Sequence, residues 1–460
     1  MKLKFFSALM IGAMFISACT KDGPEGPVDN GGTTTPIVDP NVIDLPNGNF
    51  ENDLEGWTIK AYANGDKTTV EIVEGQGVKG SKCLKIQQLP ENKKCCVGVT
   101  RQITGLEPDQ MYRLSARIRY SDITKNEGTG PVIFSPNNKQ YWNSSKYLYG
   151  TELKDWTNVT VDFMTDDNGC ATIVAALGYY QGGMQNGGHS TGTAYFDNIS
   201  LKKVTSELFN LESDHMRIFW ESSKVIVGSN ILNTWIHDVD KMYEAMAELM
   251  GATPHEGRKL AIQTTRGMYS GYWALAGYPI LWNANSDAVE TTLTQIREYG
   301  EMSFGLMHEM GHVFNMGNTS WNWNDEMFAN FRMHYALAKS GLKVCQTDEN
   351  GDFHVYEGAD IINLYRVSYE KTVQSTVNDN GIHYMLARMS DQIGWEPYKM
   401  TFDYLRRQGF TGSSNKYDKF VNFVNVLSKY ATECDPEGRT INLMDTFSTV
   451  ELNSIKRKLQ

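Results

Sequence analysis

Several features are scarce in this sequence, and each scarcity excludes a class of protein. Seven cysteines in 460 residues are too few for a scaffold held together by disulfides. Thirteen prolines and 41 glycines, spread along the chain, exclude a fibre or a low-complexity protein. Basic residues are in deficit, with 43 Lys and Arg against 54 Asp and Glu, which argues against a nucleic-acid binder. The apolar share of 41% supports sizeable cores, and the length indicates two or three domains.

The N-terminus has the pattern of an export signal. Two lysines precede an apolar stretch over 5–16 that is too short to span a bilayer. The letters ISAC at 16–19 match the bacterial lipobox, whose cysteine becomes lipidated. We therefore expect residues 1–19 to be a lipoprotein signal peptide ending at Cys19, followed by a flexible linker over 20–42. The lipid anchor would be the only membrane contact, on the cell envelope and at the surface of the outer membrane.

Residues 43–204 predict an all-β domain. Apolar and polar residues alternate, as in YRLSARIRY at 112–120, and turn residues recur every 8–12 positions. This spacing favours a sandwich of antiparallel strands. NGNFE at 47–51 and YFDNISL at 195–201 resemble the first and last strands of jelly-roll carbohydrate-binding modules.

That resemblance implies two kinds of ligand for the sandwich. A calcium ion often joins the terminal strands in such modules, and Glu51 and Asp197 stand where carboxylate ligands would be needed. A glycan ligand is also implied, because flat aromatic rings stack on sugar rings. The aromatic candidates are Tyr141, Trp142, Tyr147, Tyr149, Tyr179 and Tyr180. Tyrosine and tryptophan are equally favoured in strands for packing alone, so this function stays open.

Residues 205–460 have the periodicity of helices. Between Asp238 and Gly251, apolar residues recur on one helical face, and the glycine marks the C-terminal end. A short strand-like segment, KLAIQ at 259–263, precedes the central helices. The sequence thus predicts a multidomain protein, in which an all-β jelly-roll sandwich precedes an α-rich α+β domain of the zincin metallopeptidase type.

The motif HEMGH at 308–312 carries the chemistry of this second domain. His308 and His312 are four residues apart, so on a helix both imidazoles point to one side and can share one zinc ion. Glu309 lies about 100° further round the helix, within reach of water at the metal but not placed as a ligand. Two histidines leave room for a third protein ligand and for water.

The third ligand should come from the next helix. A turn around 317–318 would fold that helix back against the first, and it offers Glu326. Asn330, one turn later, could hydrogen-bond a ligand, which favours Glu326. Asp325 is the second choice.

Three motifs in order resemble the enhancin-like zinc metallopeptidases, the M-sixty-like family of gluzincins. They are GYWALAGYPI at 271–280, HEMGH at 308–312 and E-x-x-x-N at 326–330. Asn315 departs from the family, whose members often have Gln there. The resemblance strengthens Glu326 as third ligand, and it implies cleavage of mucin-like or other O-glycosylated proteins.

The sequence therefore predicts a zinc-dependent endopeptidase that hydrolyses O-glycosylated proteins at the envelope surface. Glu309 would be the general base, and an oxyanion stabiliser should lie opposite it. The candidates for that role are Tyr278, His334, His383 and Tyr384. The alternative is a non-catalytic glycan-binding or adhesion lipoprotein with a peptidase-like domain, and a zinc hydrolase of non-protein amides is a third possibility.

Overall fold

The computed structural model describes residues 39–61, 67–89, 96–123, 129–136, 142–178, 190–268, 272–348 and 350–460. The expected signal peptide with Cys19, most of the linker over 20–42, Tyr141, Tyr179, Tyr180 and the side chain of Trp142 lie outside the described residues. Residues 40–460 form one compact unit. None of the helices in the described part of the chain is both long and apolar enough to cross a membrane.

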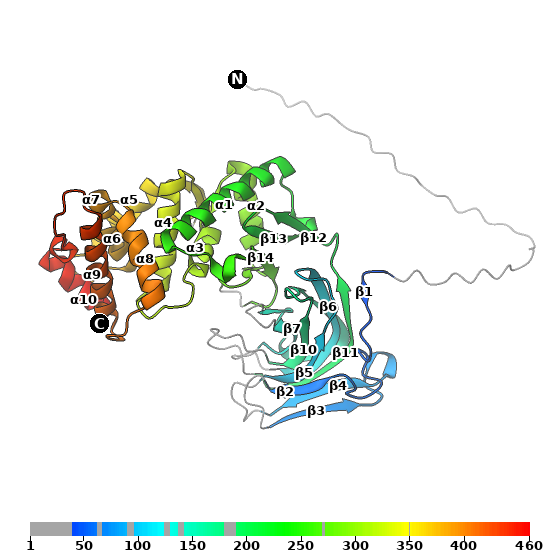
Figure 1. The fold of residues 1–460 in the computed structure, drawn as a ribbon. Coiled ribbons are helices and arrows are strands. Elements are labelled where there is room, and N and C mark those ends of the chain that lie inside the picture. Colours follow the sequence, from blue (N-terminus) through cyan, green and yellow to red (C-terminus); the bar gives the residue numbers. More distant parts are fainter. Residues whose placement is uncertain are drawn as a thin grey trace, which may run out of the picture. The chain divides into compact units, whose positions relative to one another are not determined.

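The N-terminal region is a sandwich of two antiparallel sheets (Figure 1). In spatial order, the first sheet contains β3 (Thr68–Val73), β4 (Cys83–Gln88), β11 (Gly192–Lys203), β6 (Met111–Ile123) and β9 (Gly150–Met164), with β1 (Val42–Ile43) paired to β11. The second contains β2 (Thr58–Ala61), β5 (Val97–Ile103), β10 (Ala171–Leu177), β7 (Pro131–Pro136) and β8 (Trp142–Ser144). Alternate residues face inwards, and Leu114, Ala116 and Ile118 of β6 are fully buried.

A third sheet begins four residues after the sandwich ends. Its spatial order is β12 (Leu208–Glu212), β13 (Met216–Glu221), β14 (Leu260–Thr265), β16 (Ile280–Asn283) and β15 (Ala274–Leu275). Strands β13, β14 and β16 are parallel, whereas β12 and β15 run antiparallel at the edges. Strands β13 and β14 can run parallel because the helix α1 (Ser229–Met250) connects them across the sheet. Strand β15 is the last strand in the spatial order, so it is an edge strand.

Helices make up most of the remaining chain. They are α2 (Ala288–Tyr299), α3 (Phe304–Val313), α4 (Asp325–Ser340), α5 (Gly358–Thr372), α6 (Asp379–Ala387), α7 (Ser390–Ile393), α8 (Glu396–Gln408), α9 (Lys416–Cys434) and α10 (Thr449–Leu459). A small sheet of β17 (Met302–Ser303), β18 (Val344–Thr347) and β19 (Phe353–Tyr356) lies among them. Helix α1 begins nine residues before the predicted start, because Leu232, Trp235 and Ile236 extend its buried face.

The sandwich and the helical region share one continuous hydrophobic core. Met164 of β9 and Met216 of β13 both belong to it, and both are buried. The described residues thus have a mixed α/β multidomain architecture in which the sandwich is packed onto the helical region. Within that region α3 packs against α4 (Figure 1), and these two helices carry the predicted metal ligands.

Candidate metal centre

Helix α3 places the two motif histidines on one side. His308 and His312 are one helical turn apart, and their Nε2 atoms lie 3.1 Å from each other. Helix α4 begins at Asp325, after an N-cap in which the Asn324 side chain accepts a hydrogen bond from Met327 N. This cap places Glu326 in the first turn of α4, opposite the histidines.

The carboxylate of Glu326 completes a three-residue cluster. Its Oε2 lies 3.1 Å from His308 Nε2 and 3.4 Å from His312 Nε2. A tetrahedral zinc at about 2.0–2.1 Å from each ligand atom separates those atoms by roughly 3.3 Å. Among the residues that the structure describes, this is the one group of three or more metal-binding side chains close enough to share an ion.

The other nitrogen of each imidazole has a defined partner. His308 Nδ1 lies 2.8 Å from Asn330 Oδ1, and His312 Nδ1 lies 2.8 Å from Asp325 Oδ2. Because both Nδ1 atoms face acceptors, each imidazole can donate its Nδ1 proton there and present the lone pair of its Nε2 atom to a metal ion. Two lone pairs and a carboxylate facing one another repel unless a cation lies between them, so the donor set fits zinc.

A buried arginine holds the two helices together. Arg332 of α4 is fully buried and donates hydrogen bonds to the carbonyl of Gly311, at 2.8 Å, and to Asn315 Oδ1, at 3.1 Å. Its Nη1 also lies 3.8 Å from the carboxylate of Asp325. The helices also come close together at Gly311, where an added Cβ would lie 2.5 Å from the carbonyl oxygen of Ala329.

Burial controls the charges around the cluster. It raises the pKa of Glu309, and the neighbouring His308 and His312 partly offset this effect. It lowers the pKa of Arg332 to about 10, so this side chain remains cationic at neutral pH. Burial alone would raise the pKa of Asp325, but the hydrogen bond from His312 and the charge of Arg332 lower it overall.

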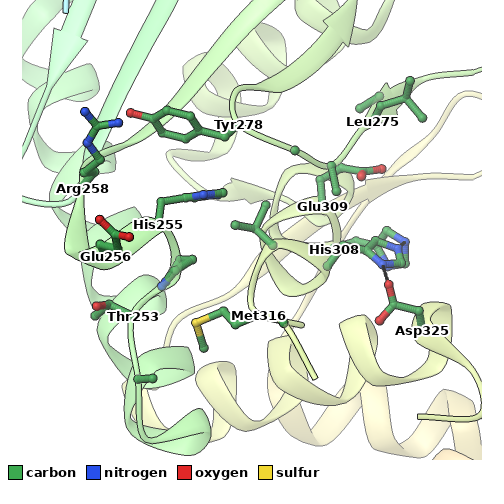
Figure 2. A pocket seen from close by; sticks show the side chains of 18 of the residues that line it. Thr253, His255, Glu256, Arg258, Leu275, Tyr278, His308, Glu309, Met316 and Asp325 are labelled. Carbon is green, nitrogen blue, oxygen red and sulfur yellow. Dashed lines mark hydrogen bonds and ion pairs between the residues drawn. The ribbon is translucent and has the colours of Figure 1, made fainter. Parts of the chain in front are cut away.

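A cavity of about 1630 Å³ opens onto this cluster. Its wall includes His308, Glu309, His312, Asp325 and Glu326. Figure 2 shows Leu275, which ends the edge strand β15, close to Glu309. The remaining wall comes from the loop that precedes β14, from the segment around β15, from the end of α3 and the residues after it, from Arg406 of α8 and from the sandwich.

Of the four expected oxyanion stabilisers, the structure brings Tyr278 to this cavity. Its hydroxyl is directed toward Arg258, away from His308 and Glu309 (Figure 2). His334 and His383 instead face each other inside the helical core, with His383 Nε2 3.4 Å from His334 Nδ1. Tyr384 packs on Tyr369, so these last three residues do not line the cavity.

His255 is a cavity residue that the sequence reasoning missed. Its ring contacts that of Tyr278 in a tilted arrangement with a centroid distance of 4.5 Å, and its Nε2 is buried without a hydrogen-bond partner in the described residues. His255 and Glu256 both have positive φ, 51° and 60°. Two consecutive non-glycine residues in this region are a strained arrangement of the kind found at functional sites. His255 lies in a loop and belongs to no recognisable motif, so nothing in the sequence indicated that it would line the cavity.

The two acids proposed for calcium approach the same loop of the sandwich. Asp197 is fully buried and accepts hydrogen bonds from Val78 N at 2.7 Å and Asn198 N at 2.6 Å. Glu51 accepts one from Lys82 N at 3.0 Å. Burial raises the pKa of Asp197 in spite of these donors. Both carboxylates thus stabilise the loop 77–82 directly, and they belong to no three-residue metal cluster within the described ranges.

The described aromatic candidates of the sandwich are involved in packing. Tyr147 is 5% exposed and belongs to a small apolar cluster that also contains Phe134 and Val174. The carbonyl of Tyr149 accepts a hydrogen bond from the hydroxyl of Tyr120. Tyr147 is thus buried, whereas Tyr149 is partly buried and packs against the same cluster.

Comparisons with known proteins gave only weak structural similarities. No protein-family model and no curated protein matches this chain. Among solved structures, the carbohydrate-binding module TmCBM61 in complex with β-1,4-galactotriose is 13% identical, with 35% of this chain and 97% of that chain covered and a TM-score of 0.26. The CBM22-2 xylan-binding domain from Paenibacillus barcinonensis Xyn10C is also 13% identical, with coverages of 34% and 97% and a TM-score of 0.23.

A longer match is a functionally unknown conserved protein from Bacillus anthracis str. Ames. It is 13% identical, with 75% of this chain and 69% of that chain covered and a TM-score of 0.39. The chain is thus weakly similar in structure to carbohydrate-binding jelly-roll modules over about a third of its length.

Proposed function

We propose that this protein is a zinc-dependent endopeptidase. The observation that carries the proposal is the convergence of His308 Nε2, His312 Nε2 and Glu326 Oε2 beside Glu309 at the wall of a large cavity. Zinc bound by two imidazoles and a carboxylate lowers the pKa of water and polarises a carbonyl. If the two histidines only stabilised the core, nothing would require both Nε2 atoms to face the carboxylate of Glu326.

Glu309 is the residue proposed to move the proton. It follows His308 on α3 and lines the same cavity, but its carboxylate is not part of the three-ligand cluster. Its raised pKa suits a group that first accepts a proton and then delivers it to the departing amine. Glu309 also interacts with the backbone of Ala276, which links it to the segment after β15.

Strand β15 is proposed to align the substrate. It is the last strand of its sheet, so one edge is not paired within that sheet. Ala274, Leu275 and Ala276 all line the cavity. An extended peptide can add to such an edge through backbone hydrogen bonds, which favours an endopeptidase that binds polypeptide over a hydrolase of small amides.

The proposed substrate class is O-glycosylated, mucin-like protein at the bacterial cell envelope. This part of the proposal relies on the three sequence motifs at 271–280, 308–312 and 326–330 and on the lipobox that ends at Cys19. The sandwich provides a second potential contact with such a substrate. A lipid on Cys19 would attach the enzyme to the outer membrane.

The decisive experiment compares wild-type protein with Glu309→Ala. Both proteins are loaded with zinc and incubated with an O-glycosylated protein, and new termini are identified by mass spectrometry. We expect one zinc per chain in both, and a loss of cleavage in the variant of about 10²–10⁴-fold, as for removal of a general base. Glu298→Ala, an exposed change on α2, is the matched control and should cleave normally.

Two results would contradict this function. Wild-type protein that contains zinc but leaves mucin, deglycosylated mucin and casein uncut is not an endopeptidase for these substrates. If Glu309→Ala cleaves as fast as the wild type, Glu309 is not the general base of the reaction. If the wild-type protein cuts none of these substrates but binds glycans, the alternative of a non-catalytic adhesion protein is favoured.

A further inference from the structure

A closed ring of four side chains joins α3 and α4 beside the histidine cluster. Asn315 Oδ1 accepts hydrogen bonds from Arg332 Nη2, at 3.1 Å, and from Asn322 Nδ2, at 3.3 Å. Asn322 Nδ2 also donates to Asp325 Oδ1 at 3.0 Å, and Arg332 Nη1 closes the ring at 3.8 Å from the same oxygen. None of these four residues belongs to the three-residue metal cluster.

One member of the ring contacts a proposed zinc ligand. Asp325 Oδ2 lies 2.8 Å from His312 Nδ1, whereas its Oδ1 faces the ring. Both oxygens of this carboxylate have defined partners, so it can fix the orientation of the His312 imidazole. His308 has a different partner, the uncharged amide of Asn330. The ring therefore contacts one histidine of the pair and not the other.

Arg332 is the member of the ring that a purely structural role explains least. Its side chain is fully buried, and its Nε has no hydrogen-bond partner among the described residues. Burying a cation is costly, and a well-packed apolar side chain of similar volume often costs less. The hydrogen bond to the carbonyl of Gly311 links the two helices but requires no positive charge. The charge is used where the guanidinium faces the carboxylate of Asp325.

The ring is attached to the beginning of α4 and to a third helix. Asn322 Oδ1 accepts a hydrogen bond from Asn324 N at 2.9 Å, and Asn324 is the N-cap of α4. Lys419 of α9 donates to the carbonyl of Asn322 at 3.1 Å. These contacts hold the ring in a fixed position relative to the first turn of α4, which contains Asp325.

We propose that Arg332 is a positioning residue of the metal centre, which holds the Asp325 carboxylate against His312 Nδ1 so that His312 Nε2 faces the ion. Arg332 does not contact the ion itself. Without the guanidinium, the half-buried carboxylate of Asp325 loses the charge beside it and turns toward water. His312 then has more than one ring orientation, and the affinity for zinc falls. This inference rests on the metal centre of the proposed function and does not depend on peptidase activity.

The test measures metal binding by the full chain carrying Arg332→Met. Methionine is also long and unbranched, but it has neither the charge nor the hydrogen-bond donors. Competition with a chromophoric chelator at constant pH should show zinc bound about 10–100-fold more weakly, the range for loss of a group that orients a metal-bound histidine. The visible spectrum of the cobalt-loaded protein should also change, because it reports the geometry of the ligands around the ion.

Arg388→Met is the matched control for loss of a partly buried arginine. Arg388 forms an ion pair at 2.8 Å with the buried Glu451 of α10, and neither residue lines the cavity. This variant should unfold at a lower temperature than the wild type, as Arg332→Met should. Its zinc affinity and cobalt spectrum should nevertheless match those of the wild type, because the metal centre keeps its ring.

A double variant separates positioning through Asp325 from a general loosening of α3 and α4. If Arg332 acts through Asp325, Arg332→Met/Asp325→Asn binds zinc no more weakly than the weaker-binding single variant. Independent effects would multiply instead. Asn315→Ala provides a second variant if Arg332→Met does not fold, because it removes the acceptor of Arg332 Nη2 and leaves Asp325 and both histidines in place. It should weaken zinc binding in the same direction.

The outcomes separate the positioning role from the peptidase. Wild-type zinc affinity in Arg332→Met or Asn315→Ala, an equal loss in Arg388→Met, or multiplied losses in the double variant would each overturn the role of Arg332. If the wild-type chain binds neither zinc nor cobalt, the proposed function fails together with this inference. If the variants behave as expected but zinc-loaded wild-type protein cuts no protein substrate, the positioning role stands and the peptidase activity fails.

Discussion

His312 Nδ1 lies 2.8 Å from a carboxylate oxygen of Asp325, the residue directly before the proposed ligand Glu326. One turn of α4 therefore supplies both the proposed third ligand and the acceptor that would orient His312 as a ligand. Asp325 is held in place by Asn322, whose side-chain amide donates to its other oxygen at 3.0 Å. Arg332 balances its charge.

Replacing Asp325 should weaken zinc binding without removing a ligand. In Asp325→Asn the charge that favours the correct tautomer of His312 is lost, and changes of this kind reduce metal affinity by about 10–100-fold. Competition with a chromophoric chelator at constant pH measures the change. Asp418→Asn, an exposed acid in the first turn of α9, should leave the affinity unaltered. Equal affinities in the two variants would show that Asp325 does not orient the ligand.

Glu326→Gln distinguishes the proposed third ligand from its neighbour. The amide is a much poorer zinc ligand than the carboxylate, so we expect a larger loss of affinity than in Asp325→Asn. Metal analysis after dialysis against a weak chelator measures the retained zinc. If Asp325→Asn loses more zinc than Glu326→Gln, the assignments of the two acids must be exchanged.

Much of the candidate site could be predicted because its chemistry follows a local pattern. His308, Glu309 and His312 are set by helical spacing alone. Glu326 and Asn330 required one further assumption, that the next helix packs back against α3, and the structure places Asn330 Oδ1 2.8 Å from His308 Nδ1. The alternation of residues 112–120 likewise indicates a strand within a sandwich, and β6 covers these residues.

The remaining site residues depend on contacts that sequence spacing does not encode. In the sequence, Arg332 has no feature that distinguishes it from other arginines in helices. In the structure, its side chain extends from α4 to α3 and donates a hydrogen bond to the carbonyl of Gly311. His334 was a candidate oxyanion stabiliser, but it is on the face of α4 that packs against Trp395 and His383. The contribution of Thr172 of β10 to the cavity depends on how the sandwich packs on the helical region. Chain order alone does not specify that packing.

Gly311→Ala should separate α3 from α4. The added Cβ would lie 2.5 Å from the carbonyl oxygen of Ala329, closer than real contacts allow. We expect a loss of about 1–3 kcal/mol in the free energy of unfolding, larger than the gain of alanine over glycine in a helix. Urea unfolding measures this value. Gly228→Ala adds a Cβ with no heavy atom within 4 Å, so it should cost only the fraction of a kcal/mol by which alanine is a poorer N-cap than glycine. An equally small loss at Gly311 would contradict the close packing.

The buried pair of His334 and His383 should make the fold sensitive to acid. Burial lowers the pKa of His334 to about 4 and that of His383 well below the ordinary 6.5. The unfolded chain therefore takes up these protons first, so the free energy of unfolding falls as the pH drops from about 6.5 toward 4. In His334→Phe/His383→Phe this fall should be smaller by a few kcal/mol. Urea unfolding from pH 7.5 to 4 in chelator measures it, with exposed His237→Phe as control. An identical pH dependence in the double variant and wild type would show that the pair is not what destabilises the protein in acid.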